Sequence, residues 1–172
     1  MALAGLYTGR KGSRPAHVLA HLCGMLIKSP TSPAEWAAYY DLRYRVLRQP
    51  WQQPRGSERS DDDAAPQTVH ALALGPDGRA VAVGRLHPSS ASEGQVRYMA
   101  VAAESQGQGL GGQVLSYLEG RARELGLGSI SLHAREAAVP FYQQHGYEMI
   151  APSHLLFVQI QHYLMRKQLP SV

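Results

Sequence analysis

Cysteine occurs once in the 172 residues, at Cys23, and the sequence has no long apolar run. A single cysteine excludes an internal disulfide framework and every multi-cysteine zinc or iron–sulfur site, and it is typical of a reducing compartment. The apolar patch at 18–22 has neither the length of a membrane span nor the small-residue signature of a cleaved export signal. We therefore expect a cytoplasmic protein that does not insert into a membrane.

An excess of positive charge is confined to the N-terminus. The chain has 17 Lys and Arg residues against 13 Asp and Glu, a net charge of +4. Residues 1–30 contain four basic residues and no acidic one, so residues 31–172 sum to zero. Because a nucleic-acid-binding protein normally gathers Lys and Arg on one folded face, we expect no nucleic-acid partner.

Histidine is the residue type that could still indicate a metal site. His17 and His21 are four residues apart and would share a helix face, but no third ligand accompanies them. The histidines later in the chain lack ligand spacing; apart from His87, discussed below, they are His70, His133, His145, His154 and His162. We expect no bound metal.

Length and composition predict one domain. A chain that is 44% hydrophobic and 17% charged is ordinary for a globular protein. A domain of this length buries about 70% of its unfolded surface and needs no disulfide or metal to fold. Residues 1–24 show no periodicity, so we interpret them as an N-terminal extension and assign 25–172 to a single domain.

The first half of that domain predicts a helix followed by a β-meander. Residues 26–27 suggest a short strand, and Ser32-Pro33-Ala34-Glu35 is typical of a helix start, with the helix continuing to about residue 48. The polar, proline-bearing segment 49–67 predicts a long surface loop that buries no apolar area. Antiparallel strands are expected over the ranges 69–74, 80–87 and 95–101, with a turn at 75–78.

The second half predicts a β-α-β crossover. The glycine-rich segment 106–112 leads into a helix that begins at Leu110 and ends at Gly126. A strand at 129–133, a short helix at 136–145, and strands at 147–150 and 155–165 are expected to follow. A crossover inside an otherwise hairpin-connected sheet indicates the α/β (α+β) class.

The glycine-rich segment is the candidate binding site. Glycines at a helix start present free backbone N–H groups and the positive end of the helix dipole to an anion such as a phosphate. A P-loop does not fit, because no Lys-Ser/Thr pair follows the last glycine. The dinucleotide pattern G-x-G-x-x-G matches Gly107, Gly109 and Gly112, but its acidic partner would be Glu124, which falls inside the helix.

A third pattern, Q/R-x-x-G-x-G/A, fits Gln106, Gly109 and Gly111 directly after a strand. This segment resembles the acyl-coenzyme A loop of the GNAT superfamily of N-acyltransferases. The segment 133–147, which contains F-Y-x-x-x-G-Y, is similar to a second motif of that superfamily. With the flanking elements, the resemblance extends over about 25–169. The stretch 41–58 is similar to a bacterial GNAT branch whose acceptors are poorly defined.

The resemblance implies a fold and a set of site residues. The fold would be a central mixed, mostly antiparallel, twisted sheet of six to seven strands flanked by helices. The backbone of the loop would hold the pyrophosphate of coenzyme A, and a strand segment would lie along its pantetheine arm and offer an N–H to the oxyanion. Tyr142 stands where the superfamily often uses a general acid for the leaving thiolate, whereas Phe141 is expected to pack. The implied cofactor-binding residues are Met99, Ala100, Val101, Gln106, Gly107, Gln108, Gly109, Leu110, Gly111 and Gly112.

A general base is harder to assign. Arg97 and Tyr98 occupy the strand positions near which many GNAT enzymes place a glutamate, so His87 or a chain of water molecules would have to serve. The acidic run 61–63 is expected to be a solvated surface, with attraction of a cationic acceptor as the alternative.

The predicted function is transfer of an acetyl group from acetyl-coenzyme A to a primary amine, on a small molecule or a peptide, by direct attack in a ternary complex without a metal. The alternative is a coenzyme A-binding sensor or interaction module that has lost turnover. The sequence leaves open the acceptor, the length of the acyl group and the choice between a monomer and a homodimer.

Overall fold

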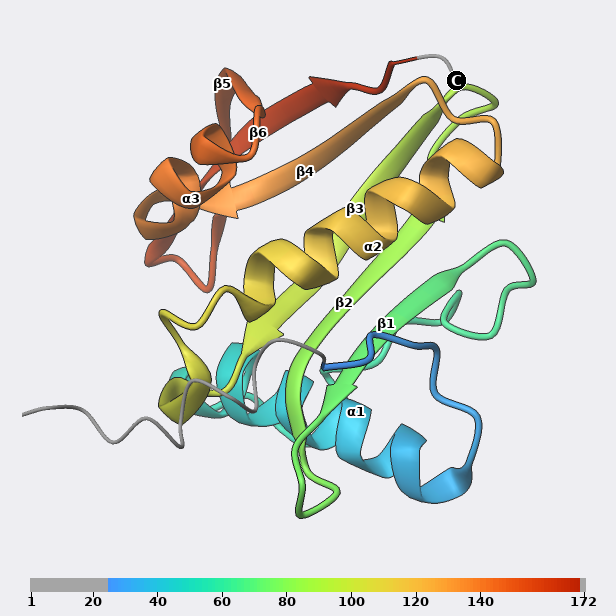
Figure 1. Cartoon of the computed structure of the whole chain (residues 1–172). Helices are drawn as coiled ribbons and strands as arrows, with labels where there is room; N and C mark the ends of the chain where they lie inside the picture. The colour runs from blue at the N-terminus through green and yellow to red at the C-terminus, as the bar shows by residue number, and fades with distance from the viewer. Residues whose placement is uncertain (1–24, 171–172) are drawn as a thin grey trace, which may run out of the picture.

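The computed structural model describes residues 25–170, and within them six strands form one twisted sheet (Figure 1). The strand order is β1-β2-β3-β4-β6-β5. All neighbours are antiparallel except β3 and β4, which are parallel. The predicted α/β class with a mixed, mostly antiparallel sheet is therefore confirmed. The strands are β1 (Val69–Leu74), β2 (Ala80–Pro88), β3 (Glu93–Val101), β4 (Ser129–Arg135), β5 (Glu148–Leu156) and β6 (Ile160–Gln168).

Two long helices cover opposite faces of β1 to β3. Helix α2 (Leu110–Glu124) buries Val114 and Leu118 in the larger core together with alternate strand residues such as Ala71. Helix α1 (Pro33–Leu47) buries Tyr39 and Leu42 against the other face, where Leu72 points. Since successive strand residues point to opposite faces, this alternation gives the molecule three layers.

Close contact between α2 and the sheet depends on Gly84 in β2. A Cβ atom at this position would lie 2.7 Å from the Met99 sulfur and 2.8 Å from a Val114 methyl carbon. Both distances are shorter than any normal carbon contact, so a side chain here would push α2 and β3 away from β2.

Short helical elements complete the fold. They are the helix α3 (Val139–Gln144) and the 3-10 turns η1 (Gln49–Trp51), η2 (Ala103–Ser105) and η3 (Glu136–Ala138).

The start of α1 follows its sequence signature. The Ser32 hydroxyl accepts a hydrogen bond from the Glu35 backbone N–H at 3.2 Å, and Glu35 accepts in return from the Ser32 N–H, which completes a capping box. Pro33 occupies the first turn, where a missing N–H leaves no bond unmade. The predicted helix start is confirmed.

Three sequence predictions about the strands and loops were wrong in detail. Residues 26–27 form no strand; the segment pairs only through Lys28, which makes an isolated bridge to Leu72. The expected strand at 155–165 is divided by a turn at 157–159, because Phe157 and Val158 adopt positive φ without any glycine to signal it. The loop 49–67 is not wholly at the surface, since Glu58 and Asp63 are buried.

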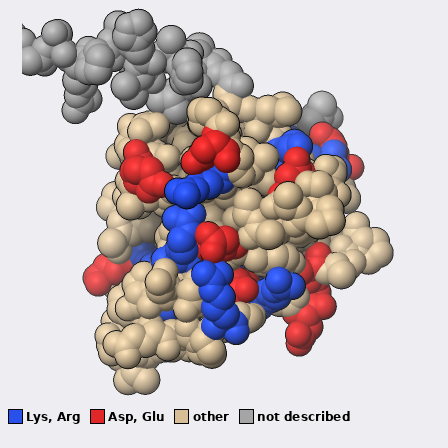
Figure 2. Space-filling model, turned by 90° about the horizontal axis from the view of Figure 1, so that it is seen from below, with Lys and Arg blue, Asp and Glu red and all other residues tan. Residues whose placement is uncertain are grey.

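The structure describes neither residues 1–24 nor 171–172, so the sequence interpretations of Cys23, His17 and His21 lie outside it. No helix within 25–170 combines the length and apolarity needed to cross a membrane. On the face seen in Figure 2, basic and acidic side chains lie next to one another rather than in separate fields.

Candidate active site

The site is a cavity of about 1000 Å³ that opens where β3 and β4 separate. These parallel strands pair only from Glu93–Ser129 to Val96–Leu132. Immediately after, β3 contains an irregularity in its pairing with β2, and Tyr98 adopts a φ of 55°. A bulge of this kind bends a strand away from its neighbour. The later part of β3 therefore has β2 on one side and the cavity on the other.

The predicted pantetheine segment lies in this opened part. Met99, Ala100 and Val101 all line the cavity. Ala100 and Val101 pair with Val83 and Ala82 of β2, but no residue of β4 pairs with them on the other side. Their edge can therefore accept an extended ligand as an added strand.

The glycine loop forms one end of the cavity. Gly107 and Gly109 have φ angles of 72° and 80°, which only glycine adopts readily, and nothing lies within 4 Å of a Cβ built on either. Gly109 is the N-cap of α2 and carries no capping side chain, so the first N–H groups of the helix remain available to a ligand. The loop residues that line the cavity are Gln106, Gly107, Gly109, Leu110, Gly111 and Gly112.

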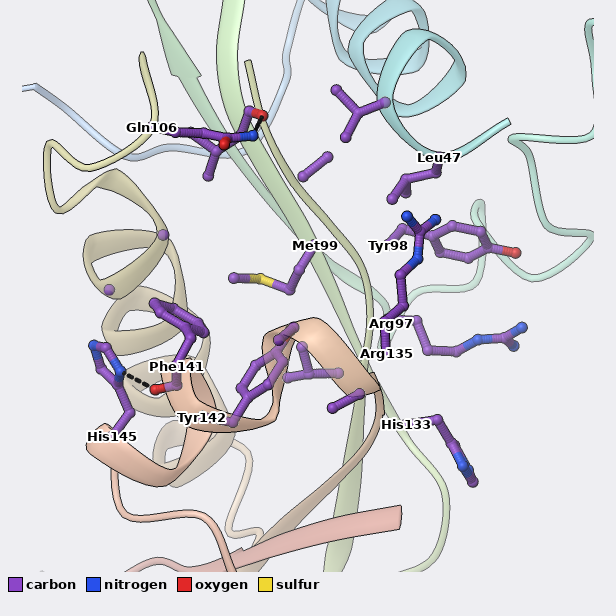
Figure 3. Close-up of a pocket in the computed structure, with 18 of the residues that line it drawn as sticks. Leu47, Arg97, Tyr98, Met99, Gln106, His133, Arg135, Phe141, Tyr142 and His145 are labelled. Atoms are coloured by element: carbon purple, nitrogen blue, oxygen red, sulfur yellow. Dashed lines mark hydrogen bonds between the residues drawn. The ribbon is translucent and has the colours of Figure 1, made fainter. Parts of the chain in front are cut away.

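Three loop residues differ from the expectation of a uniform ligand cradle. Gln108 does not line the cavity, and its side-chain amide donates to the Glu104 carbonyl at 3.1 Å. A Cβ on Gly111 would lie 3.2 Å from the Phe141 ring, and one on Gly112 would lie 2.7 Å from the His145 Nε2. The last two glycines thus allow α3 to pack against α2 (Figure 3).

Tyr142 of α3 lines the cavity wall. The side chain is buried, packs edge-on against Phe141 and Tyr147, and forms no hydrogen bond with the described residues. Burial raises the pKa of its hydroxyl well above the ordinary value of 10, and the positive charge of Arg135 opposes the shift only in part. The phenol therefore keeps its proton at neutral pH.

The other predicted groups lie elsewhere. His87 does not line the cavity, and its Nδ1 lies 3.2 Å from the Arg85 guanidinium. Asp63 is buried between Arg43, at 3.1 Å, and Arg85, at 2.9 Å. Asp62 also pairs with Arg85. Two of the three residues of the acidic run, Asp62 and Asp63, thus form ion pairs within the domain. The expectation of a solvated surface was wrong for Asp63, which is buried.

Three histidines that seemed scattered in sequence meet at the cavity wall. His133, His154 and His162 come from β4, β5 and β6, with ring centroids 5.2 Å apart for the first pair and 4.7 Å for the second. Burial lowers the pKa of His133 and of His162, and the charge of His154 lowers both further. Within 25–170, no three His, Cys, Asp or Glu side chains are placed to hold a metal ion.

The sequence reasoning missed the histidine group and two arginines, Arg48 and Arg135, that also line the cavity. These residues could have been found only from the register of the strands, which places Arg135 of β4 opposite His162 of β6. Strand order and register are set by tertiary packing rather than by local spacing.

The glycine loop, the separated strands and the F-Y-x-x-x-G-Y segment can now be compared with known proteins. Residues 36–147, well over half of the chain, match the acetyltransferase (GNAT) family. The chain belongs to the GNAT family of acetyltransferases. The resemblance inferred from the motifs is thereby confirmed, and with it the assignment to an enzyme family.

One relative is similar to this GNAT chain in sequence, and two solved structures are similar to it in fold. It is 32% identical over 74 residues to the uncharacterised N-acetyltransferase YjcF of Bacillus subtilis; the match covers 43% of this chain and about half, 53%, of YjcF. An aminoglycoside 6'-N-acetyltransferase solved with coenzyme A superposes with a TM-score of 0.73 at 15% identity, over 86% of this chain and 99% of that one. An acyl-CoA N-acyltransferase from Pseudomonas aeruginosa gives 0.71 at 23% identity, over 84% and 98%.

Proposed function

We propose that this GNAT protein transfers the acetyl group of acetyl-coenzyme A to a primary amine by direct attack within a ternary complex. The observation that carries the proposal is the placement of the Tyr142 side chain in the wall of the cavity that begins at the glycine loop. The open space beside Gly107 and Gly109 fits the pyrophosphate of coenzyme A. The unpaired edge of Met99, Ala100 and Val101 fits its pantetheine arm.

In this proposal each residue has a role at a stated atom. The acceptor nitrogen forms a bond to the thioester carbonyl carbon, and a backbone N–H near Val101 stabilises the oxyanion. When the carbon–sulfur bond breaks, the Tyr142 hydroxyl gives its proton to the thiolate. The phenol keeps its proton until the thiolate forms, and the resulting thiol, with a pKa of about 8.5, stays protonated at neutral pH once solvent has reprotonated the phenolate. Tyr142 then regains a proton from solvent.

The amine must lose a proton before or during the attack. His87 is outside the cavity, and four histidines line it. His145 donates its Nδ1–H to the Phe141 carbonyl next to the glycine loop, so the proposed acceptors of this proton are His133, His154 and His162. The lowered pKa values of His133 and His162 keep these imidazoles neutral at pH 7, so that each has a ring nitrogen free to accept a proton.

The test is acceptor-dependent release of coenzyme A thiol from acetyl-coenzyme A, measured against pools of amino acids, peptides, polyamines and aminoglycosides. Release above the acceptor-free rate, together with the acetylated product by mass spectrometry, supports the proposal. Saturable binding of coenzyme A with no release for any pool would contradict it and favour a binding module that lacks turnover.

A further inference from the structure

Three arginines face the cavity without an acidic partner. Arg48 follows α1, Arg97 lies in β3 and Arg135 ends β4, and none of the cavity-lining residues among those described is an Asp or Glu. Ion pairs engage every other Lys and Arg within 25–170: Lys28, Arg43, Arg45, Arg55, Arg59, Arg79, Arg85, Arg121, Arg123, Arg166 and Lys167. The unpaired cations of the described domain are thus the three at the cavity.

The guanidinium groups of Arg48 and Arg135 are held in place by neighbouring side chains, and the three positive charges repel one another. Arg48 donates to the Ser57 carbonyl at 2.9 Å and lies over the Phe157 ring, whereas Arg135 lies over Trp51. Burial lowers the pKa of Arg48 and of Arg135; the charge of Arg97 lowers that of Arg48, and the charge of Arg48 lowers that of Arg135. Arg48 and Arg135 are half-buried, whereas Arg97 is exposed. Half-buried cations without counter-charges are costly, so an anion bound among the three arginines would relieve the repulsion.

The position of the arginines separates them from the phosphate end of the cavity. In Figure 3, Gln106, Phe141 of α3 and His145, which follows α3, lie to one side of Met99 and Tyr142, and Arg97 and Arg135 lie to the other. Coenzyme A phosphates at the glycine loop would therefore be remote from these guanidiniums. The arginines face the region that lies beyond the reacting carbonyl.

We infer that Arg48, Arg97 and Arg135 bind an anionic group, a carboxylate or a phosphate, carried by the amine acceptor. This inference rests on the proposed function, because it places the acceptor beyond Tyr142. Guanidinium groups bind both anions through two parallel hydrogen bonds. The acceptor class is then amino acids, acidic peptides or phosphorylated amines. Polyamines and aminoglycosides are repelled by the same charges.

The experiment uses acceptors that share an amine and differ in charge. Glycine, L-phenylalanine and L-glutamate are compared with their carboxamides, and glucosamine 6-phosphate with glucosamine, by thiol release from acetyl-coenzyme A. We expect the anionic member of at least one pair to have a kcat/KM more than tenfold higher. Arg97→Gln should remove most of that ratio by raising KM, with little change in affinity for coenzyme A. Arg79→Gln, whose guanidinium pairs with Asp77 in the β1–β2 turn, is the matched control and should keep the ratio.

Two further measurements show whether the anion belongs to the acceptor or to the acyl donor, and whether a negative result rejects the anion site or the proposed function. Equal kcat/KM within every pair, or a preference for spermidine or kanamycin, would overturn the inference. So would turnover of succinyl-coenzyme A with neutral amines that depends on Arg97, since the anion would then belong to the donor. If no acceptor releases thiol, thermal shifts with the same pairs decide separately. Stabilisation by the anionic members alone, absent in Arg97→Gln, would retain the anion site while the proposed function fails; its absence would reject both.

Discussion

Among single residues, the hydroxyl of Tyr142 is the most direct test of the chemistry. Tyr142→Phe should lower turnover by roughly 10²- to 10⁴-fold, the usual effect of a lost general acid. Phenylalanine keeps the ring that packs against Phe141 and Tyr147, and the hydroxyl makes no hydrogen bond within the described residues, so folding and coenzyme A affinity should change little. Steady-state thiol release at saturating acetyl-coenzyme A, with calorimetry for affinity, measures both. If the variant keeps near-parental turnover under conditions in which the chemical step limits the rate, Tyr142 is not the general acid.

A single glycine tests the binding loop in the same way. Gly109→Val should weaken coenzyme A binding severely, because the side chain would fill the open space at the start of α2 where the pyrophosphate is proposed to lie. Gly126 is the matched control, since it has a similar φ of 75°, open surroundings and a place at the far end of the same helix. Gly126→Val should suffer similar backbone strain and retain the affinity. Equal losses in the two variants, measured by calorimetry, would indicate strain rather than a ligand site.

Residues with local signatures were predicted from the sequence, and residues joined by tertiary pairing were not. The glycine loop and Tyr142 are set by spacing within one segment, so the motifs located them. His154 and His162 lie next to each other because β5 and β6 form a hairpin whose turn, at Phe157 and Val158, has no glycine. Nothing in the local sequence marks that turn.

At the scale of elements, the buried carboxylate of Asp63 holds the segment between α1 and β1 against α1 and β2. Asp63 pairs with Arg43 of α1 and Arg85 of β2, and Arg43 lies 3.6 Å from the centre of the Tyr98 ring at the bulge. Asp63→Asn would leave the buried Arg43 guanidinium without a counter-charge and Arg85 with Asp62 alone, and should lower the free energy of unfolding by about 3–5 kcal/mol. Asp61→Asn, at an exposed position of the same run, should change it by less than about 0.5 kcal/mol. Urea denaturation of both variants distinguishes a structural Asp63 from a surface charge.

The cap of α1 gives the protein a component of acid sensitivity. Hydrogen bonds from Lys28 and Thr31 lower the pKa of Glu35 from 4.5 to about 2. A carboxylate with a lowered folded-state pKa stabilises the fold above its unfolded pKa, and this stabilisation is lost as the pH falls towards the folded pKa. The difference in unfolding free energy between the parent and Glu35→Gln should therefore be constant above about pH 5.5 and shrink between about pH 4.5 and 2. A difference that stays constant to pH 2 would show that Glu35 titrates normally.

Helix ends and the first hairpin were predictable because each carries its own chemistry, such as the Ser32 cap and the Gly126 stop. The role of segment 49–67 was not, since a polar, proline-bearing stretch looks the same in sequence whether its carboxylates face water or buried arginines. The partner of Asp63 that decides this, Arg85, is 22 positions away on a strand of the sheet.

For the whole molecule, the decisive question is where the folded unit begins. We predict that a chain starting at Met25 folds as the full chain does, because residues 25–170 form a six-stranded sheet and two core clusters, and Met25 and Ile27 pack against the larger cluster. A chain starting at Thr31 is the matched comparison. It would lack the Lys28 backbone bonds to Leu72, at 3.0 and 2.8 Å, and the Lys28 ion pair with Glu35.

The chain starting at Met25 should keep the urea midpoint and the coenzyme A affinity of the full chain. The chain starting at Thr31 should be less stable, but its folded molecules should bind coenzyme A with unchanged affinity. The affinity should not change because Lys28 pairs with β1 at the edge of the sheet, whereas the cavity lies between β3 and β4. Both chains are compared with the full one by urea denaturation and calorimetry. A large loss of stability on removal of residues 1–24 would place part of that segment in the folded unit and move the predicted domain boundary towards the N-terminus.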